Sequence, residues 1–224
     1  MQDLIKQEQF ELELLDRLNS QKLLNKLVFG GGTMLRLCFG LNRFSVDLDF
    51  WVVKKISEAG LFKDLKECLN RSYKITDCAN KFYTLLFEIK SRDYPRSLKL
   101  EIRKETKKIR VEQAIAYSKY ANTQVFLNVV SLKDMLVAKI GAFLERKEIR
   151  DAFDMEFLLK KGIELDTSPA ILEKVLKEIN SLTKRDYSVK LGSVLEEGQR
   201  RYYLTENFKI LKSAIQEKIK PSTP

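Results

Sequence analysis

Hydrophobic positions change their spacing several times along the first part of the chain. Leucine and phenylalanine recur at helical intervals over residues 3–19 and predict an amphipathic helix. The apolar segment 26–29 predicts a short strand that leads straight into three glycines and Thr33. A helix after these glycines is expected to end near Gly40, and residues 45–53 have the composition of a strand. The chain is therefore expected to begin with a helix and then to alternate strand, glycine turn, helix and strand.

The middle of the chain is rich in short strand-like segments, and the remainder is helical. A helix is expected over 58–70, and the segments expected to be extended are 73–76, 82–90, 97–104 and 124–130. From Ser131 the spacing is helical, and the predicted helices cover 131–146, 149–161, 169–181 and 187–218. Residues 221–224 are expected to form a frayed tail. These elements predict an α+β fold, with a mixed sheet and helices in residues 1–125 and a helical domain in residues 126–224.

The composition excludes several kinds of catalytic chemistry and indicates the cellular compartment. The 224 residues include no histidine, which excludes Ser–His–Asp and Cys–His nucleophile pairs and every scheme with imidazole as base. Three scattered cysteines are too few for a disulfide framework and indicate buried, reduced thiols. No apolar run approaches the roughly 20 residues that a membrane span needs. A cytoplasmic protein without a membrane partner is expected. The formal net charge of +10 favours an anionic partner such as nucleotide or nucleic acid.

The glycine turn and a pair of aspartates form the first candidate site. A strand that ends in glycines and opens a helix offers backbone N–H groups to a phosphate, although such turns are often only turns. Asp47 and Asp49 are two residues apart on the next predicted strand, so both side chains leave one face, about 7 Å apart. Paired carboxylates repel each other unless a cation lies between them, and Mg²⁺ uses one or two carboxylates together with phosphate oxygens. Glycine turn and aspartates together predict a metal–nucleotide site.

A third carboxylate would complete a site for two metal ions. Residues 98–103 alternate, which places Lys99, Glu101 and Arg103 opposite three apolar residues. Glu101 is therefore the first candidate to join Asp47 and Asp49, and Glu88 is the alternative. Two ions held in this way would activate an attacking hydroxyl and stabilise the leaving group.

A second group of polar residues lies in the helical part. Lys139, Ala142 and Arg146 fall on one helical stripe, and Asp151 and Asp154 are one turn apart. The small residue between two cations leaves room for an anionic ligand. A surface helix with ion pairs would show the same pattern, and this group alone does not decide between the two interpretations.

The two groups together resemble a known family. The string GGGTMLRL followed by Arg43-x-Ser45-x-Asp47-x-Asp49-Phe50 resembles the GG[ST]…RxSxDxDF signature of the AbiEii/AbiGii nucleotidyltransferase-like toxins. That group includes the MenT-type toxins and belongs to the polymerase-β-like nucleotidyltransferase superfamily. Residues 139–154 resemble its KxxAxxxR…RDxxD block, and the resemblance covers about residues 25–160. It implies a nucleotidyltransferase-like mixed sheet followed by a helical domain that contributes Lys139 and Asp151 to the active site.

The resemblance also implies roles for individual residues. Gly31, Gly32 and Thr33 would hold the triphosphate, with Ser45 beside the acidic pair. Asp47 and Asp49 would coordinate Mg²⁺, or Mn²⁺ in its place, with Glu101 as the third ligand inferred from strand alternation. Lys139 would contact the nucleotide phosphates, Asp151 would complete the active site, and Arg146 and Asp154 would contact substrate or orient these groups. Three glycines precede Thr33 here, so the pair that binds phosphate is defined only to within one position.

The expected activity follows from that family. The chain would be a Mg²⁺-dependent nucleotidyltransferase that moves NMP from an NTP to an RNA hydroxyl, with the tRNA 3′ end as acceptor. It would be the toxin of a toxin–antitoxin pair, neutralised by a cognate antitoxin. Residues 81–110 carry ten basic against four acidic side chains, a net +6, which suits a polyanionic acceptor, with Tyr83 and Tyr94 available for stacking. The alternatives are nucleotidyl or phosphoryl transfer to a protein hydroxyl and a non-catalytic nucleotide-binding module.

Overall fold

The computed structural model of the chain describes residues 1–52, 57–105 and 108–220. Contacts between Cα atoms divide the chain into two compact units, Met1–Ser131 and Leu132–Pro224. Three predictions fall outside the described residues: the last residue of the 45–53 strand, Lys107 of the basic segment and the tail at 221–224.

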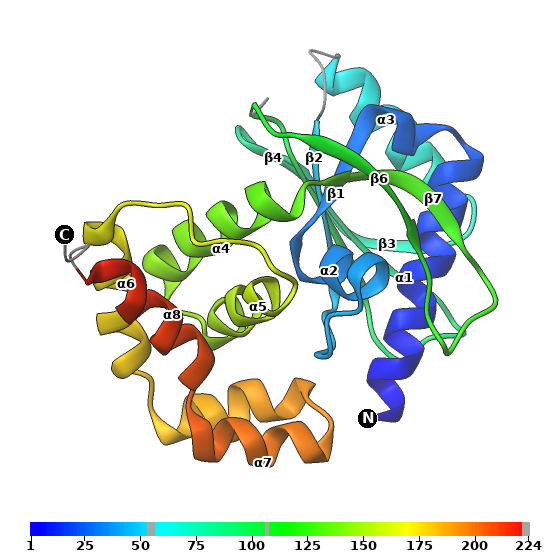
Figure 1. Cartoon of the computed structure of the whole chain (residues 1–224). Helices are drawn as coiled ribbons and strands as arrows, with labels where there is room; N and C mark the ends of the chain where they lie inside the picture. The colour runs from blue at the N-terminus through cyan, green and yellow to red at the C-terminus, as the bar shows by residue number, and fades with distance from the viewer. Residues whose placement is uncertain (53–56, 106–107, 221–224) are drawn as a thin grey trace. The chain divides into compact units, whose positions relative to one another are not determined.

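The first unit is a twisted sheet with helices (Figure 1). Its elements are α1 (Gln2–Ser20), η1 (Leu23–Lys26), β1 (Leu27–Gly30), α2 (Gly31–Phe39), β2 (Asp47–Val52), α3 (Glu58–Asn70), β3 (Lys74–Asn80), β4 (Thr84–Lys90), β5 (Leu98–Arg103), β6 (Val111–Ala116) and β7 (Val125–Val130). Gly40 ends α2 in the left-handed conformation at φ 78°, and Ser57 caps α3 by accepting a hydrogen bond from the Gly60 N–H at 3.2 Å. These stop and start signals are visible in the sequence.

The strands of this unit lie in the order β3-β4-β5-β2-β1-β7-β6. β2 pairs antiparallel with β1 and parallel with β5, and β1 pairs parallel with β7. Leu48 and Phe50 of β2 lie on the same face as Leu100 and Ile102 of β5, and all four are buried. Because side chains alternate along a strand, the residues between them leave the opposite face. One face of the central strands therefore builds the core, and the other is left for polar groups.

The second unit is helical, with an irregular connection before its last two helices. Its elements are α4 (Leu132–Arg146), α5 (Ile149–Lys160), α6 (Pro169–Asn180), η2 (Asp186–Leu191), η3 (Gly192–Val194), α7 (Glu197–Glu206) and α8 (Lys209–Ile219). The single helix predicted over 187–218 is wrong. The chain becomes extended at Leu195, and Asn207 and Phe208 have positive φ angles of 49° and 57°, which a right-handed helix cannot contain.

Two further differences concern the sheet. β6 lies within a stretch for which no element was predicted, because Glu112 and Gln113 are poor strand formers and the strand has a neighbour on one side alone among the described strands. β3 continues past the predicted end at Thr76, where its pairing with β4 shifts register.

The two units divide after Ser131 rather than at residue 125, since β7 pairs within the sheet. The predicted α+β architecture is confirmed.

Within the part of the chain that the structure describes, no helix combines the length and the apolar character that crossing a membrane requires.

Candidate active-site residues

Two aspartates lie side by side on the polar face of β2. Asp47 and Asp49 are half-buried, while Leu48 and Phe50 on the opposite face are buried in the core. The arrangement is the one expected from the alternation of residues 46–50. Two carboxylates therefore project from one strand face at a spacing of about 7 Å.

Glu101 lies directly beside this pair. In the parallel pairing of β2 with β5, Asp49 is level with Glu101 and Asp47 is level with Lys99. Residues that are level in neighbouring strands project from the same face, so three carboxylates share it. The alternative residue, Glu88, lies one strand farther away on β4, level with Lys99, and accepts a hydrogen bond from the Ser97 hydroxyl at 2.5 Å. The geometry therefore favours Glu101 over Glu88 as the third member of the group.

Lys99 supplies a positive charge within this group. Its ammonium forms an ion pair with the Glu101 carboxylate. The hydrogen bond to Glu101 raises the pKa of Lys99, and the charges of Asp47 and Asp49 act in the same direction. The lysine thus lies on one sheet face with Asp47, Asp49 and Glu101, and Glu88 of β4 is level with it on its other side.

The carboxylates of Asp47, Asp49 and Glu101 are suitable ligands for a divalent cation, although the three are not grouped tightly around one point. Among residues 1–52, 57–105 and 108–220, no three Asp, Glu, Cys or His side chains are grouped closely enough to hold a metal ion. Mg²⁺ requires one or two protein carboxylates when substrate phosphates and water supply the other oxygens. Asp47 and Asp49 meet that requirement, and Glu101 is the adjacent third donor.

The glycine turn packs directly against these residues. A Cβ atom on Gly31 would lie 2.2 Å from Oδ2 of Asp49, and Gly31 has a positive φ of 75°. A Cβ on Gly32 would lie 2.6 Å from an Arg43 guanidinium nitrogen and 2.8 Å from the Ser45 hydroxyl. The two glycines therefore place the first turn of α2 against both the aspartate strand and the residues that precede it. A helix N-terminus at this point presents free backbone N–H groups to an anion.

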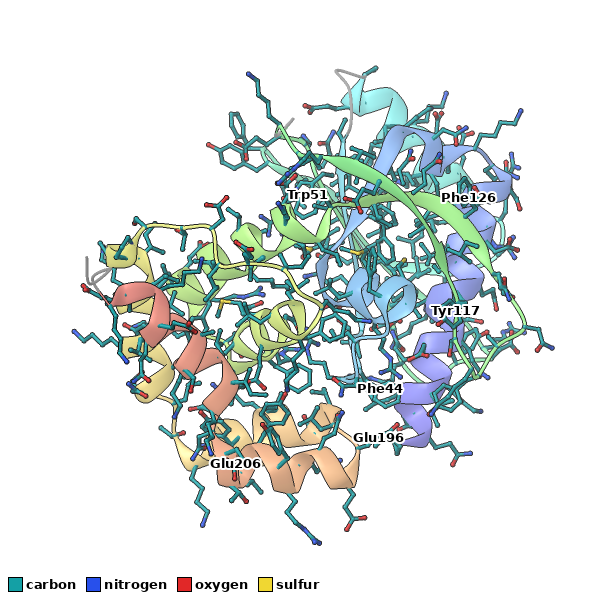
Figure 2. All side chains as sticks on the ribbon, viewed as in Figure 1. Phe44, Trp51, Tyr117, Phe126, Glu196 and Glu206 are labelled. Carbon is teal, nitrogen blue, oxygen red and sulfur yellow. The ribbon has the colours of Figure 1, made fainter. Side chains whose placement is uncertain are left out.

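Thr33 and Trp51 fix the glycine turn in place. Thr33 is buried, and its hydroxyl donates a 2.6 Å hydrogen bond to the backbone carbonyl of Asp47, which ties α2 to β2. The Trp51 ring, labelled in Figure 2, lies so close to Gly30 that a Cβ there would meet it at 2.1 Å. Neither interaction can be read from the sequence, because each depends on the exact approach of two segments.

Replacing Gly31 by Ala is expected to destabilise the protein and to weaken nucleotide binding. The added Cβ collides with the Asp49 carboxylate and must also adopt a positive φ. Gly40→Ala is the matched control, because Gly40 has a φ of 78° and no atom within 4 Å of its Cβ position. We expect Gly40→Ala to cost about 1 kcal/mol of unfolding free energy from backbone strain, and Gly31→Ala to cost about 1–3 kcal/mol more. Urea denaturation and nucleotide titration of both variants measure the difference, and equal costs would disprove the close approach.

A second polar cluster is buried in the helical unit. The Lys139 ammonium lies 3.2 Å from Oδ1 of Asp151 and 2.6 Å from Oδ2 of Asp154. Arg146 donates two hydrogen bonds to the Asp151 carboxylate, at 2.7 and 2.8 Å. Both aspartates are fully buried, Lys139 is nearly so, and the Arg146 side chain is about half exposed. The four charged residues singled out in this part of the sequence thus form one cluster of ion pairs.

One buried acidic residue near the aspartates was not predicted from the sequence. Glu11 of α1 is completely buried, and neither of its carboxyl oxygens has a hydrogen-bond partner. Burial raises the pKa of Glu11 well above its usual value, and the neighbouring charges of Glu8 and Asp47 raise it further against the opposing effect of Arg36. Glu11 is therefore a buried carboxyl group close enough to Asp47 for the two charges to influence each other.

Comparison with known proteins agrees with the fold and the motifs. A family model described as "Nucleotidyl transferase AbiEii toxin, Type IV TA system" matches residues 13–218. The crystal structure of JHP933 from Helicobacter pylori superposes with a TM-score of 0.58 at 22% identity and covers 93% of each chain. A second H. pylori structure, described as a "putative nucleotidyltransferase", has a TM-score of 0.57 at 22% identity and covers 93% of this chain and 96% of its own. At this identity the two structures show a shared fold. None of the curated proteins matches the chain.

Proposed function

The chain belongs to the AbiEii family of nucleotidyltransferase toxins, and from this premise we propose that it transfers NMP from an NTP to an RNA hydroxyl. The proposed acceptor is tRNA, at its 3′ end. The type IV toxin–antitoxin assignment of the family implies a cognate antitoxin. The observation that supports the activity most directly is that Gly31 packs against Asp49, which is itself level with Glu101. This places the oxygens proposed to bind metal beside the turn proposed to bind phosphate.

In the proposed reaction the acceptor oxygen forms a bond to the α-phosphorus while the bond from that phosphorus to the β-phosphate oxygen breaks. Pyrophosphate leaves, and the hydroxyl proton passes to a carboxylate of the site or to water. Asp47, Asp49 and Glu101 would hold Mg²⁺, which when bound neutralises phosphate charge and lowers the pKa of the attacking hydroxyl. The backbone N–H groups at the start of α2 bind and orient the triphosphate. No step needs histidine.

The residues of the helical cluster are proposed to act on the nucleotide as well. Arg146 is the member that an anion can reach, because about half of its side chain is exposed. Lys139 is enclosed by Asp151 and Asp154, so a phosphate could bind its ammonium only by replacing a carboxylate. We therefore propose that Arg146 binds phosphate first, that Lys139 contacts it after exchanging a carboxylate for a phosphate oxygen, and that Asp151 and Asp154 otherwise set the positions of both cations.

An exposed pair of aromatic rings supports a single-stranded nucleic acid as acceptor. Phe82 and Tyr83 lie in the turn between β3 and β4, 83% and 71% exposed, with ring centroids 4.6 Å apart. Thr84 is level with the exposed Arg103 of β5, so one cation adjoins the turn, whereas the Lys104 ammonium is paired with Glu58. Exposed rings beside cations are suited to stacking unpaired bases.

Tyr94 does not share this role. Its ring stacks on Phe10 at a centroid distance of 4.5 Å, and its hydroxyl donates a 2.8 Å hydrogen bond to Glu13. Burial and the Glu13 carboxylate raise the pKa of Tyr94. Of the two tyrosines expected to stack on RNA, only Tyr83 has a ring that is free to do so.

Replacing both Phe82 and Tyr83 by Ala is expected to weaken binding of single-stranded RNA by about tenfold or more, because base stacking contributes about 1–3 kcal/mol per base. Tyr117→Ala with Phe126→Ala is the matched control, since these aromatic residues are 55% and 57% exposed in the β6–β7 part of the sheet (Figure 2). Fluorescence anisotropy with a labelled oligonucleotide measures both affinities. An equal loss in the two double variants would contradict a specific role for the β3–β4 turn.

The proposed function is tested by incubating the protein with total tRNA, Mg²⁺ and each α-labelled NTP in turn. Label on RNA supports nucleotidyl transfer and identifies the base. Label on protein alone would replace RNA with a protein hydroxyl as the acceptor. Binding of NTP with no label on either would favour a non-catalytic nucleotide-binding module.

A further inference from the structure

Lys99 occupies an unusual place for a cation. It projects from the same sheet face as Asp47, Asp49 and Glu101, and it lies level with Asp47 across the β2–β5 pairing. Its ammonium is paired with Glu101, the carboxylate proposed as the third ligand of the metal. About 44% of the Lys99 side chain and 30% of the Glu101 side chain are exposed, so the lysine can leave without unpacking the core.

The ion pair reduces the electrostatic repulsion between the carboxylates on this face. Three carboxylates that share one face repel each other, and a cation among them lowers that repulsion. Lys99, paired with Glu101, supplies such a cation. A divalent cation that bound the same carboxylates would be repelled by the ammonium, so the two cations compete for one position.

We propose that Lys99 is an internal counter-ion that holds the place of the divalent cation, and that it moves away from Glu101 when a metal–nucleotide complex binds. This inference rests on the proposed function, because it assumes that Asp47 and Asp49, with Glu101 beside them, form the metal site. The triphosphate brings enough negative charge to attract the released ammonium. Metal binding thereby becomes dependent on nucleotide, and the free protein binds metal weakly.

An ordinary surface ion pair would behave differently. Such pairs contribute little to stability, and their removal would leave the affinity for metal unchanged. Competition predicts the opposite: removing the ammonium should strengthen metal binding while leaving the carboxylates in place. Direct measurement of metal binding therefore separates the two interpretations without any need for catalysis.

The test measures Mn²⁺ binding to the nucleotide-free protein by the EPR signal of the free ion. We expect Lys99→Met to bind Mn²⁺ about fivefold to tenfold more tightly than the natural protein, after allowance for screening of a half-exposed charge. Lys99→Arg keeps the charge and should resemble the natural protein. Lys63→Met, which removes the exposed lysine of the Lys63–Glu67 pair on α3, is the matched control and should have no effect.

Two outcomes would overturn the proposal. Unchanged or weaker Mn²⁺ binding by Lys99→Met would show that the ammonium does not compete with metal. Asp47→Asn measured in the same assay separates this failure from that of the proposed function. If Asp47→Asn also leaves Mn²⁺ binding unchanged, the carboxylates are not the metal site. If it abolishes binding while Lys99→Met has no effect, the metal site stands and only the role of Lys99 is wrong.

Discussion

Replacing Asp47 by Asn is expected to reduce nucleotidyl transfer by about a thousandfold or more, with little change in stability. The amide keeps the size of the side chain and leaves the backbone carbonyl free to accept the Thr33 hydrogen bond. It removes the negative charge that would hold Mg²⁺, and a bound metal contributes several kcal/mol to stabilising the transition state. Initial rates of label incorporation into RNA measure the loss, and thermal denaturation monitors the fold.

The matched control for this variant is Asp77→Asn. Asp77 is an exposed strand aspartate in the same unit, on β3 and level with Glu88, so its substitution makes the same chemical change away from the glycine turn. We expect its rate to equal that of the natural protein. Comparable rates in Asp47→Asn and Asp77→Asn would exclude Asp47 from the reaction.

Replacing Lys139 by Met is expected to lower the free energy of unfolding by about 3–5 kcal/mol, the usual cost of removing one partner from a buried ion pair. The substitution leaves Asp151 and Asp154 without the ammonium that lies between them. Asp151 keeps its two hydrogen bonds from Arg146. If these hydrogen bonds compensate for the lost ammonium, the cost lies in the lower part of this range. Urea denaturation followed by far-UV circular dichroism measures the effect.

Lys218→Met is the control for this measurement. Lys218 forms an exposed 4.0 Å ion pair with Glu164 in the same unit, and loss of such a pair costs about 0–1 kcal/mol. If Lys139→Met were as mild as Lys218→Met, the buried cluster would not stabilise the unit. A loss of nucleotide binding in that case would then report on phosphate contact alone.

Much of the carboxylate face could be predicted because strand alternation is a local property. The pattern in residues 46–50 and 98–103 assigned Asp47, Asp49 and Glu101 to polar faces, and the structure places these faces in register. The ion pair of Lys99 with Glu101 could not be predicted, since alternation places both residues on one face without saying which groups pair. Sequence reasoning also missed the close packing of Gly31 on Asp49, which depends on tertiary approach.

The errors in the fold have equally specific causes. Residues 187–218 have nearly continuous helical composition, yet the chain turns at Asn207 and Phe208 through left-handed conformations that the apolar pattern does not reveal. The sequence of β6 is weakly strand-like, and its conformation is stabilised by pairing with β7 rather than by local preference. Local patterns therefore predicted those elements whose own residues form the core, and failed where a neighbouring segment determines the backbone.

The parallel pairing of β2 with β5 has a consequence for when the protein becomes active during its synthesis. The two strands lie about 50 positions apart, with α3 and the β3–β4 hairpin between them. Pairing of such distant segments must wait until the intervening chain has been made and its loop has closed. A growing chain therefore displays Asp47 and Asp49 well before Glu101 can join them. We expect partial translation products that end before β5 to be inert, so that an interrupted ribosome releases no active toxin.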